Sequence, residues 1–105
     1  MKRKTKHIST LIKQAIGRID SKAEIILYGS RARGNERPDS DWDVLILTEY
    51  SVDIIQERQF RNALYDLELE TGEPFSVFVY SKNDWDTKQI ITPFYANVTR
   101  EGISL

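Results

Sequence analysis

Two aspartates stand at the entrance to an apolar run, in the order Asp41-Trp42-Asp43 just before residues 44–47. On a strand, residues two apart point to the same face with α-carbons roughly 6.5 Å apart, so the two carboxylates can converge on one cation. Burying them there is costly unless something pairs with them. Because all-oxygen ligands favour magnesium or manganese over zinc, we predict that Asp41 and Asp43 bind Mg²⁺ or Mn²⁺. The alternative is a solvated strand end in which Ser40 or Asp41 caps the local backbone.

Gly29 and Ser30 follow another apolar run, and ten residues separate Ser30 from Asp41. Glycine lets the backbone approach a phosphate closely, N–H groups at a helix start favour anions, and serine adds a hydroxyl donor. Arg31 and Arg33 come directly afterwards and are predicted to join Gly29 and Ser30 in binding a nucleotide. A lone Gly-Ser is usually only a turn, and the arginines can instead pair with neighbouring acids. The joint occurrence of this turn and the carboxylate pair favours a nucleoside triphosphate whose phosphates are bridged by magnesium.

Hydrophobic periodicity predicts one α/β domain over residues 1–105 to position these side chains. The expected elements are an amphipathic helix over 8–19, strands over 24–28, 44–47 and 75–80, a long helix from the cap Asp53 to about Thr71, and a short helix beginning at Ser81. Gly72 is expected to end the long helix. Two strands joined by a long helix are expected to be parallel through a right-handed crossover. The tail over 93–105 has no clear pattern and receives no element.

The composition excludes several classes of protein. Fifteen Lys and Arg against 16 Asp and Glu give a net charge of −1, which argues against a surface that binds nucleic acid by charge alone. The lack of cysteine excludes disulfide scaffolds and thiolate sites, and a single histidine excludes a zinc site built from histidines. The longest apolar runs are too short to span a membrane, and the first residues lack a signal region, so a cytoplasmic location is expected.

The spacing Gly29-Ser30, ten residues, then Asp41-x-Asp43 resembles the signature of the DNA polymerase β superfamily of nucleotidyltransferases. The arginines after the serine, and a serine before the first aspartate, are most similar to its minimal nucleotidyltransferase branch. The resemblance extends over most of the chain, as far as residues 97–102. It implies a small mixed β-sheet with flanking helices, the polymerase β-like fold. It also implies transfer of a nucleoside monophosphate from an NTP such as ATP to an acceptor hydroxyl.

The resemblance assigns roles to the residues of the motif. Gly29 and Ser30 would bind the triphosphate. Asp41 and Asp43 would ligate metals that neutralise the phosphates and lower the pKa of the acceptor hydroxyl. Magnesium is therefore the expected cofactor and a nucleoside triphosphate the expected substrate.

A second protein chain is also expected. Minimal members of the family are often encoded beside a helical HEPN-domain protein, and some act as antitoxins that adenylylate it. A chain of 105 residues has little room to bind an acceptor, so a partner or a homodimer is expected to complete the cleft. Phe94 and Tyr95 are the best candidates for such a surface, because two adjacent aromatic residues are difficult to bury together.

Position 76 departs from the family pattern. Active members usually carry a third carboxylate after Gly-x-Pro-x, whereas here Gly72-Glu73-Pro74-Phe75 is followed by Ser76. A serine hydroxyl is a poor metal ligand and not a base at neutral pH. Three hypotheses therefore stay open: a nucleotidyltransferase, an impaired module that binds a nucleotide or a HEPN-type partner, and a folded remnant that does neither.

Overall fold

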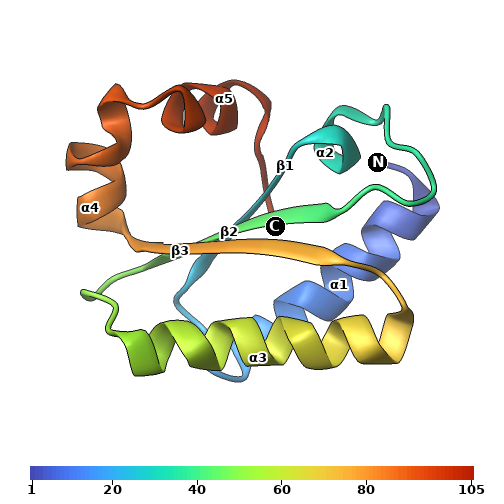
Figure 1. Cartoon of the computed structure of the whole chain (residues 1–105), viewed down its shortest axis with the longest axis horizontal. Helices are drawn as coiled ribbons and strands as arrows, with labels where there is room; N and C mark the ends of the chain where they lie inside the picture. The colour runs from blue at the N-terminus through green and yellow to red at the C-terminus, as the bar shows by residue number, and fades with distance from the viewer.

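A four-stranded mixed sheet forms the centre of the computed structural model, which describes residues 1–105 (Figure 1). The strands are β1 (Glu24–Tyr28), β2 (Trp42–Thr48), β3 (Phe75–Ser81) and β4 (Ile103–Ser104). They stand in the order β3-β2-β1-β4. β1 is antiparallel to both β2 and β4, whereas β2 is parallel to β3. The predicted α/β class, the mixed sheet and the parallel pair are therefore confirmed.

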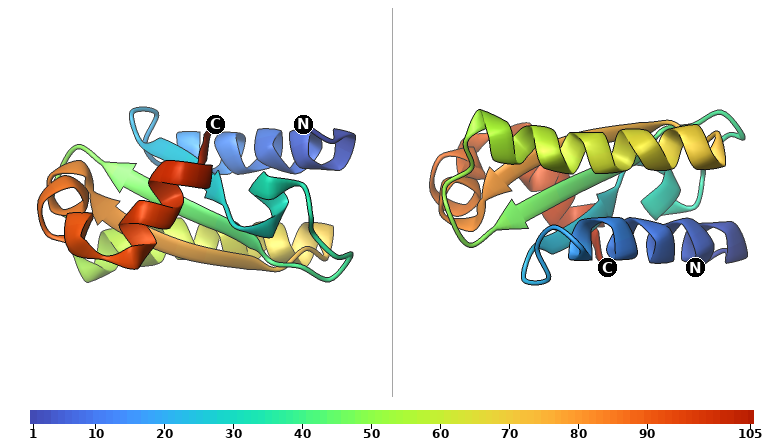
Figure 2. Two further views of the ribbon diagram at one scale, coloured as in Figure 1. Left: turned by 90° about the horizontal axis from the view of Figure 1, so that it is seen from above. Right: turned by 90° about the horizontal axis from the view of Figure 1, so that it is seen from below.

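Two long helices, α1 (Arg3–Gly17) and α3 (Ile54–Thr71), lie alongside each other across one face of the sheet (Figure 2). Each fully buried Val, Leu, Ile or Phe side chain stabilises the fold by about 1.5–3 kcal/mol, so this layer supplies most of the hydrophobic stabilisation. Its core consists of 12 buried residues: Ile8, Ile12, Ile16, Ile25, Leu27, Trp42, Val44, Ile46, Phe60, Leu64, Leu67 and Val77.

The ends of α3 are fixed by local interactions that the sequence predicts. Asp53 accepts a hydrogen bond from the Gln56 N–H at 2.7 Å, and the Gln56 side chain accepts one from the Asp53 N–H at 3.0 Å. This reciprocal pair satisfies two N–H groups at the start of the helix. At the other end Gly72 adopts a left-handed conformation with φ +75°, which stops the helix before β3.

A thinner layer covers the other face of the sheet. It contains α4 (Lys82–Thr87), the 3-10 helix η1 (Gln89–Ile91) and α5 (Pro93–Glu101), and the single turn α2 (Ser30–Arg33) stands on the same side (Figure 1). Only four buried residues form its core: Leu45, Leu47, Trp85 and Val98. Ser81 caps α4 by accepting a hydrogen bond from the Asp84 N–H at 3.0 Å.

Some element boundaries differ from the sequence predictions. The first helix ends at Gly17 rather than near Ile19, because the Ile19 N–H already bonds back to the Ile16 carbonyl in a tighter turn. Ile19 is consequently 37% exposed and does not join the core. β2 begins at Trp42, two residues earlier than the apolar run indicates. No helix of the chain is both long and apolar enough to cross a membrane.

The tail over 93–105 is ordered, although its sequence suggests no element. Thr92 caps α5 by accepting a hydrogen bond from the Tyr95 N–H, and Pro93 occupies the first helical position. Phe94 and Tyr95 are both half-buried and pack against Trp85, so the expectation that two adjacent rings are difficult to bury together is wrong, whereas their role in a partner surface stays a prediction. Adjacent side chains of a helix point in different directions, so Phe94 and Tyr95 can both pack against Trp85.

Candidate functional site

The two aspartates lie at the start of β2, in the middle of the sheet. Asp43 is paired with Tyr28 of β1 and with Ser76 of β3. Because Trp42 belongs to the core under α1 and α3, the alternation along the strand turns Asp43 toward the side of α4 and α5. Asp43 is half-buried, whereas Asp41 is exposed and precedes the strand.

The pKa of Asp43 shows how its surroundings act on the carboxylate. Burial raises this pKa most, the neighbouring Asp41 raises it further, and Glu101 adds to the effect while Arg33 opposes it. Asp41 is therefore within electrostatic range of the Asp43 carboxylate. Negative charge therefore exceeds positive charge around Asp43, and a bound cation would relieve the repulsion.

Two carboxylates are too few to build a complete metal site. No group of three or more His, Cys, Asp or Glu side chains in the chain is arranged to hold a metal ion. Magnesium, however, usually keeps several waters and takes further ligands from substrate phosphates. Asp41 and Asp43 thus fit a metal that arrives with a nucleotide better than one that is bound permanently.

Gly29 forms the turn between β1 and α2, directly beside Asp43. Its φ of +76° favours glycine, and a Cβ added at this position would overlap the Asp43 carboxylate. Its carbonyl accepts hydrogen bonds from the Ala32 and Arg33 N–H groups at 3.1 and 3.0 Å, which closes the single turn of α2. The half-buried Ser30 follows, and its hydroxyl makes no hydrogen bond within the chain. The predicted turn and the predicted carboxylate are therefore in contact.

Glu101, at the end of α5, completes this arrangement and was not found by sequence reasoning. One carboxylate oxygen accepts the Gly29 N–H at 3.1 Å, and the other accepts from Arg33 Nη1 at 2.9 Å. Burial alone would raise the pKa of Glu101, but these two hydrogen bonds and the positive charges of Arg33 and Arg100 outweigh it and lower the pKa. Glu101 thus ties the C-terminal helix to the turn that carries Gly29.

Arg31 points away from Asp43, although it lies in the same motif. Its side chain is 4% exposed, and its guanidinium stands 4.4 Å over the Trp42 ring on the side of α1. It donates to the Ser40 carbonyl at 3.0 and 3.3 Å and to the Pro38 carbonyl at 3.3 Å. The guanidinium therefore fixes the loop that leads into Asp41.

Two carboxylates extend this buried cluster around Arg31. Glu36 lies 3.9 Å and Glu73 lies 3.7 Å from the guanidinium. Lys2 pairs with Glu36 at 3.1 Å, and Lys4 pairs with Glu73. The cluster joins the first turn of α1 to the two loops that flank the start of β2.

No other acid replaces the carboxylate that is missing at position 76. Ser76 is directly opposite Asp43, which confirms that the serine stands next to the predicted metal ligand. Glu73 accepts a hydrogen bond from Trp42 Nε1 at 3.2 Å and so faces the other side of the sheet. Glu68 is also engaged, since it accepts the Phe75 N–H at 3.1 Å.

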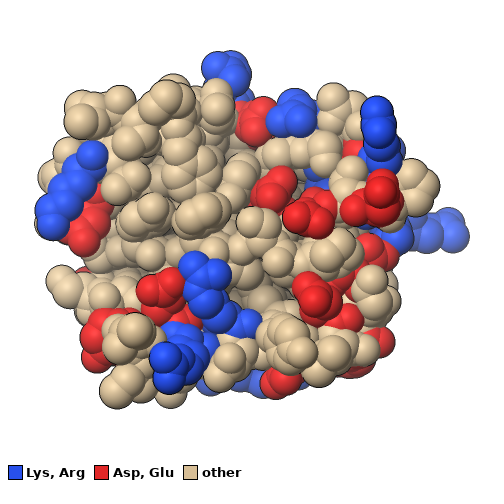
Figure 3. All heavy atoms as spheres, in the orientation of Figure 1, with Lys and Arg blue, Asp and Glu red and all other residues tan.

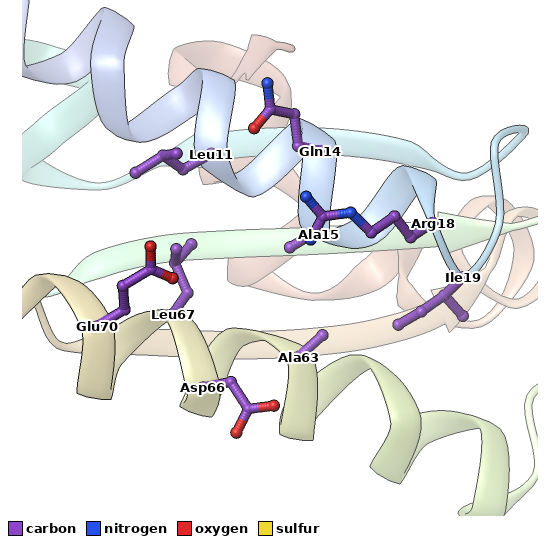
Figure 4. A pocket seen from close by; sticks show the side chains of 9 residues that line it. All are labelled: Leu11, Gln14, Ala15, Arg18, Ile19, Ala63, Asp66, Leu67 and Glu70. Atoms are coloured by element: carbon purple, nitrogen blue, oxygen red, sulfur yellow. The ribbon is translucent and has the colours of Figure 1, made fainter.

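The main hollows of the surface are not lined by Asp43. The face seen in Figure 3 carries interspersed acidic and basic side chains, and the area over α4 and α5 is mostly uncharged. A groove of about 370 Å³ lies between α1 and α3, on the opposite side of the sheet (Figure 4). It is lined by Leu11, Gln14, Ala15, Arg18, Ile19, Ala63, Asp66, Leu67 and Glu70. Its mixed charges and open shape are those of an ordinary groove between two packed helices.

Comparison with known proteins relates this geometry to a family. Residues 9–99 match the family model described as "Nucleotidyltransferase domain". No curated protein matches the sequence.

Solved structures with the same fold agree with this match. A toxin-antitoxin crystal structure with AMP-PNP superposes with a TM-score of 0.65 at 16% identity, over 90% of this chain and 69% of that one. The toxin-antitoxin MntA-HpeT, crystallised with two aspartates two positions apart changed to glutamate, gives 0.56 at 16% identity, over 95% and 70% of the two chains. A third crystal structure, of a protein with a provisional nucleotidyltransferase assignment, gives 0.53 at 24% identity, over 94% and 97%. At these identities the likeness concerns the fold.

Proposed function

Since the chain belongs to the nucleotidyltransferase domain family, we propose that it binds a magnesium-bound nucleoside triphosphate between the Gly29 turn and the Asp41–Asp43 pair. The observation that carries the proposal is the contact between Gly29 and the Asp43 carboxylate, because it sets a glycine turn that could receive a phosphate, once Glu101 releases the Gly29 N–H, beside a carboxylate that could ligate a cation. ATP is the triphosphate we expect first, since a structural neighbour was crystallised with AMP-PNP.

The proposed reaction is nucleotidyl transfer. An acceptor hydroxyl attacks the α-phosphorus, the bond to the β-phosphate oxygen breaks, pyrophosphate leaves, and the hydroxyl proton is lost to solvent or a base. Magnesium, when bound, would neutralise phosphate charge and lower the pKa of the attacking hydroxyl. Asp41 and Asp43 would hold this ion, and the repulsion between their carboxylates favours its binding.

The two arginines of the motif receive different roles in this proposal. Arg33 is partly exposed on α2, so its guanidinium can turn from Glu101 toward a phosphate. Arg31 is buried over Trp42, and we assign it the positioning of the loop before Asp41 instead of a direct phosphate contact. Ser30 offers a free hydroxyl as a phosphate donor.

A second candidate function is a module that binds nucleotide and a partner protein without transfer. Ser76 opposite Asp43 favours it, because the third carboxylate is lacking at that point. A toxin-antitoxin partner fits either function, since two structural neighbours are toxin-antitoxin proteins. A helical HEPN-type toxin, or a second copy of this chain, would then present the acceptor or complete the cleft.

Calorimetric titration of ATP with and without magnesium tests the binding site. We expect magnesium-dependent binding that is lost in Asp43→Asn and retained in the matched control Asp39→Asn, an exposed acid of the preceding loop. Binding that is equal in both variants, or no binding up to millimolar ATP in the wild type, would contradict the proposed site.

Transfer is tested separately with α-labelled ATP and co-purified partner proteins. Label that appears on a partner and is lost in Asp43→Asn supports the transferase. Binding without label in the wild type, followed by labelling in Ser76→Asp, would instead support the impaired module, because only the missing carboxylate then limits the reaction.

A further inference from the structure

An aromatic surface adjoins Asp43 on the same face of the sheet, formed by Tyr28, Phe78 and Phe94. We refer to these three rings as the aromatic shelf. Phe94 lies 5.3 Å from Tyr28 and 5.2 Å from Phe78, measured between ring centroids. The three rings come from β1, β3 and α5, so they meet only in the folded chain.

The register of the sheet places the shelf next to the carboxylate pair. Tyr28 is the β1 partner of Asp43, and Ser76 is its β3 partner. Phe78 lies two residues beyond Ser76 on the same face, which is a step of roughly 7 Å along the strand. The shelf therefore begins beside Asp43 and extends away from the Gly29 turn toward α4 and α5.

Phe78 is the open part of the shelf. Its residue is 41% exposed, although a ring of this size is usually covered when it borders a core. Phe94 is held from behind by Trp85, which meets it edge-on at 5.3 Å with an interplanar angle of 81°. The shelf is thus rigid on its inner side and presents an uncovered aromatic ring on its outer side.

We propose that the aromatic shelf binds the planar base of the nucleoside triphosphate by stacking on Phe78. This inference rests on the proposed function, which places the phosphates between Gly29 and Asp43. The ribose of a nucleotide separates its base from the α-phosphate. Phe78 is likewise separated from Asp43, because it lies two residues beyond Ser76 on β3. A flat apolar ring system fits the uncharged surface over α4 and α5 better than a charged group would (Figure 3).

The chemistry of the shelf also defines its selectivity. The Tyr28 phenol supplies its only polar atom, a single hydroxyl. One hydroxyl cannot distinguish four bases by their different hydrogen-bonding groups. Stacking tolerates any base, so the site is expected to accept all four and to favour the larger purines.

The experiment compares two ligands that share phosphates but differ in the base. ATP and inorganic tripolyphosphate are each titrated, with magnesium, into wild-type protein, Phe78→Ala and the control Tyr65→Ala, which removes a more exposed ring from α3 on the other face. Stacking of one base on one ring corresponds to about a 5- to 150-fold gain in affinity. We expect the wild type to bind ATP more tightly than tripolyphosphate by this factor.

The Phe78→Ala change should abolish the ATP advantage and leave tripolyphosphate binding unchanged. Phe78→Trp should restore the advantage, and Tyr65→Ala should alter neither ligand. Equal affinity of the wild type for both ligands would overturn the proposed stacking on the aromatic shelf but would not contradict the proposed function. A Phe78→Ala variant that weakens both ligands alike would also overturn it, because the ring would then act through the fold. Failure of both ligands to bind the wild type would overturn the proposed function together with the shelf.

Discussion

Replacing the buried Arg31 offers the strongest test of how the site is built. Arg31→Met keeps the length of the side chain but removes the guanidinium that holds the Ser40 and Pro38 carbonyls and stacks on Trp42. Breaking a buried charged pair by removing one partner costs about 3–5 kcal/mol. Glu36 retains Lys2 and Glu73 retains Lys4, so neither carboxylate is left alone.

The magnitude therefore falls at the lower end of this range. We expect Arg31→Met to lower the free energy of unfolding by about 3 kcal/mol, a large share of the roughly 5–15 kcal/mol typical of a domain. For a domain of this size, that loss lowers Tm by roughly 12–24 °C. Arg31→Lys keeps the charge but loses the planar fork and the stacking on Trp42, and we expect it to lose about half as much.

Urea unfolding at neutral pH measures these losses, with Arg37→Met as the control because Arg37 is an exposed arginine of the same loop. The m-value should stay constant in all variants. A loss within about 0.5 kcal/mol of wild type for both Arg31 variants would be that of a surface residue and would refute the reasoning. Loss of ATP binding at unchanged stability would show instead that the Arg31 guanidinium contacts the phosphates.

Three further outcomes follow from the described contacts. Gly29→Ala should lower the free energy of unfolding by about 1–3 kcal/mol because of the positive φ, and by a further amount because the new Cβ overlaps Asp43. Gly34 also has a positive φ of +78° but open space around it, so Gly34→Ala should show only the loss caused by φ in the same unfolding assay. The pKa of Glu73 is lowered in the folded state, so its contribution to stability is present at neutral pH and is lost as the pH falls through that lowered pKa. Glu73→Gln should accordingly unfold with a weaker acid dependence below about pH 4.5 than the wild type. Magnesium alone should show no saturable calorimetric binding without nucleotide, because the chain provides too few ligands, and micromolar binding of the bare ion would contradict this.

The sequence predicts those parts of the fold that depend on neighbours along the chain. Asp53 and Gly72 carry the signals that begin and end α3, and both are used as expected. The proximity of Gly29 to Asp43 could also be predicted, because Gly29 follows one apolar run and Asp43 precedes the next, and antiparallel strands joined by a loop bring these two points together.

Other features depend on contacts between distant residues and leave no local signal. Glu101 reaches Gly29 across 72 positions of the chain, from a tail with no recognisable pattern. Arg31 and Arg33 are two residues apart on a single helical turn, so they point to different sides, but only the position of Trp42 decides which arginine becomes buried. The sequence could therefore suggest which residues gather at the site, but not how each guanidinium is used.

The unequal layers of the sheet have a consequence for its motions. The core under α1 and α3 contains 12 buried residues, whereas the core under α4 and α5 contains four. Regions with fewer buried apolar contacts open locally at lower free energy than the rest of a protein. Backbone amides of α5 should therefore exchange with deuterium faster than those of α3, through partial openings that leave the larger core intact. Since Phe94 and Glu101 both lie on α5, such an opening would detach the shelf and release the Gly29 turn together, and a bound nucleotide would slow exchange along the whole helix.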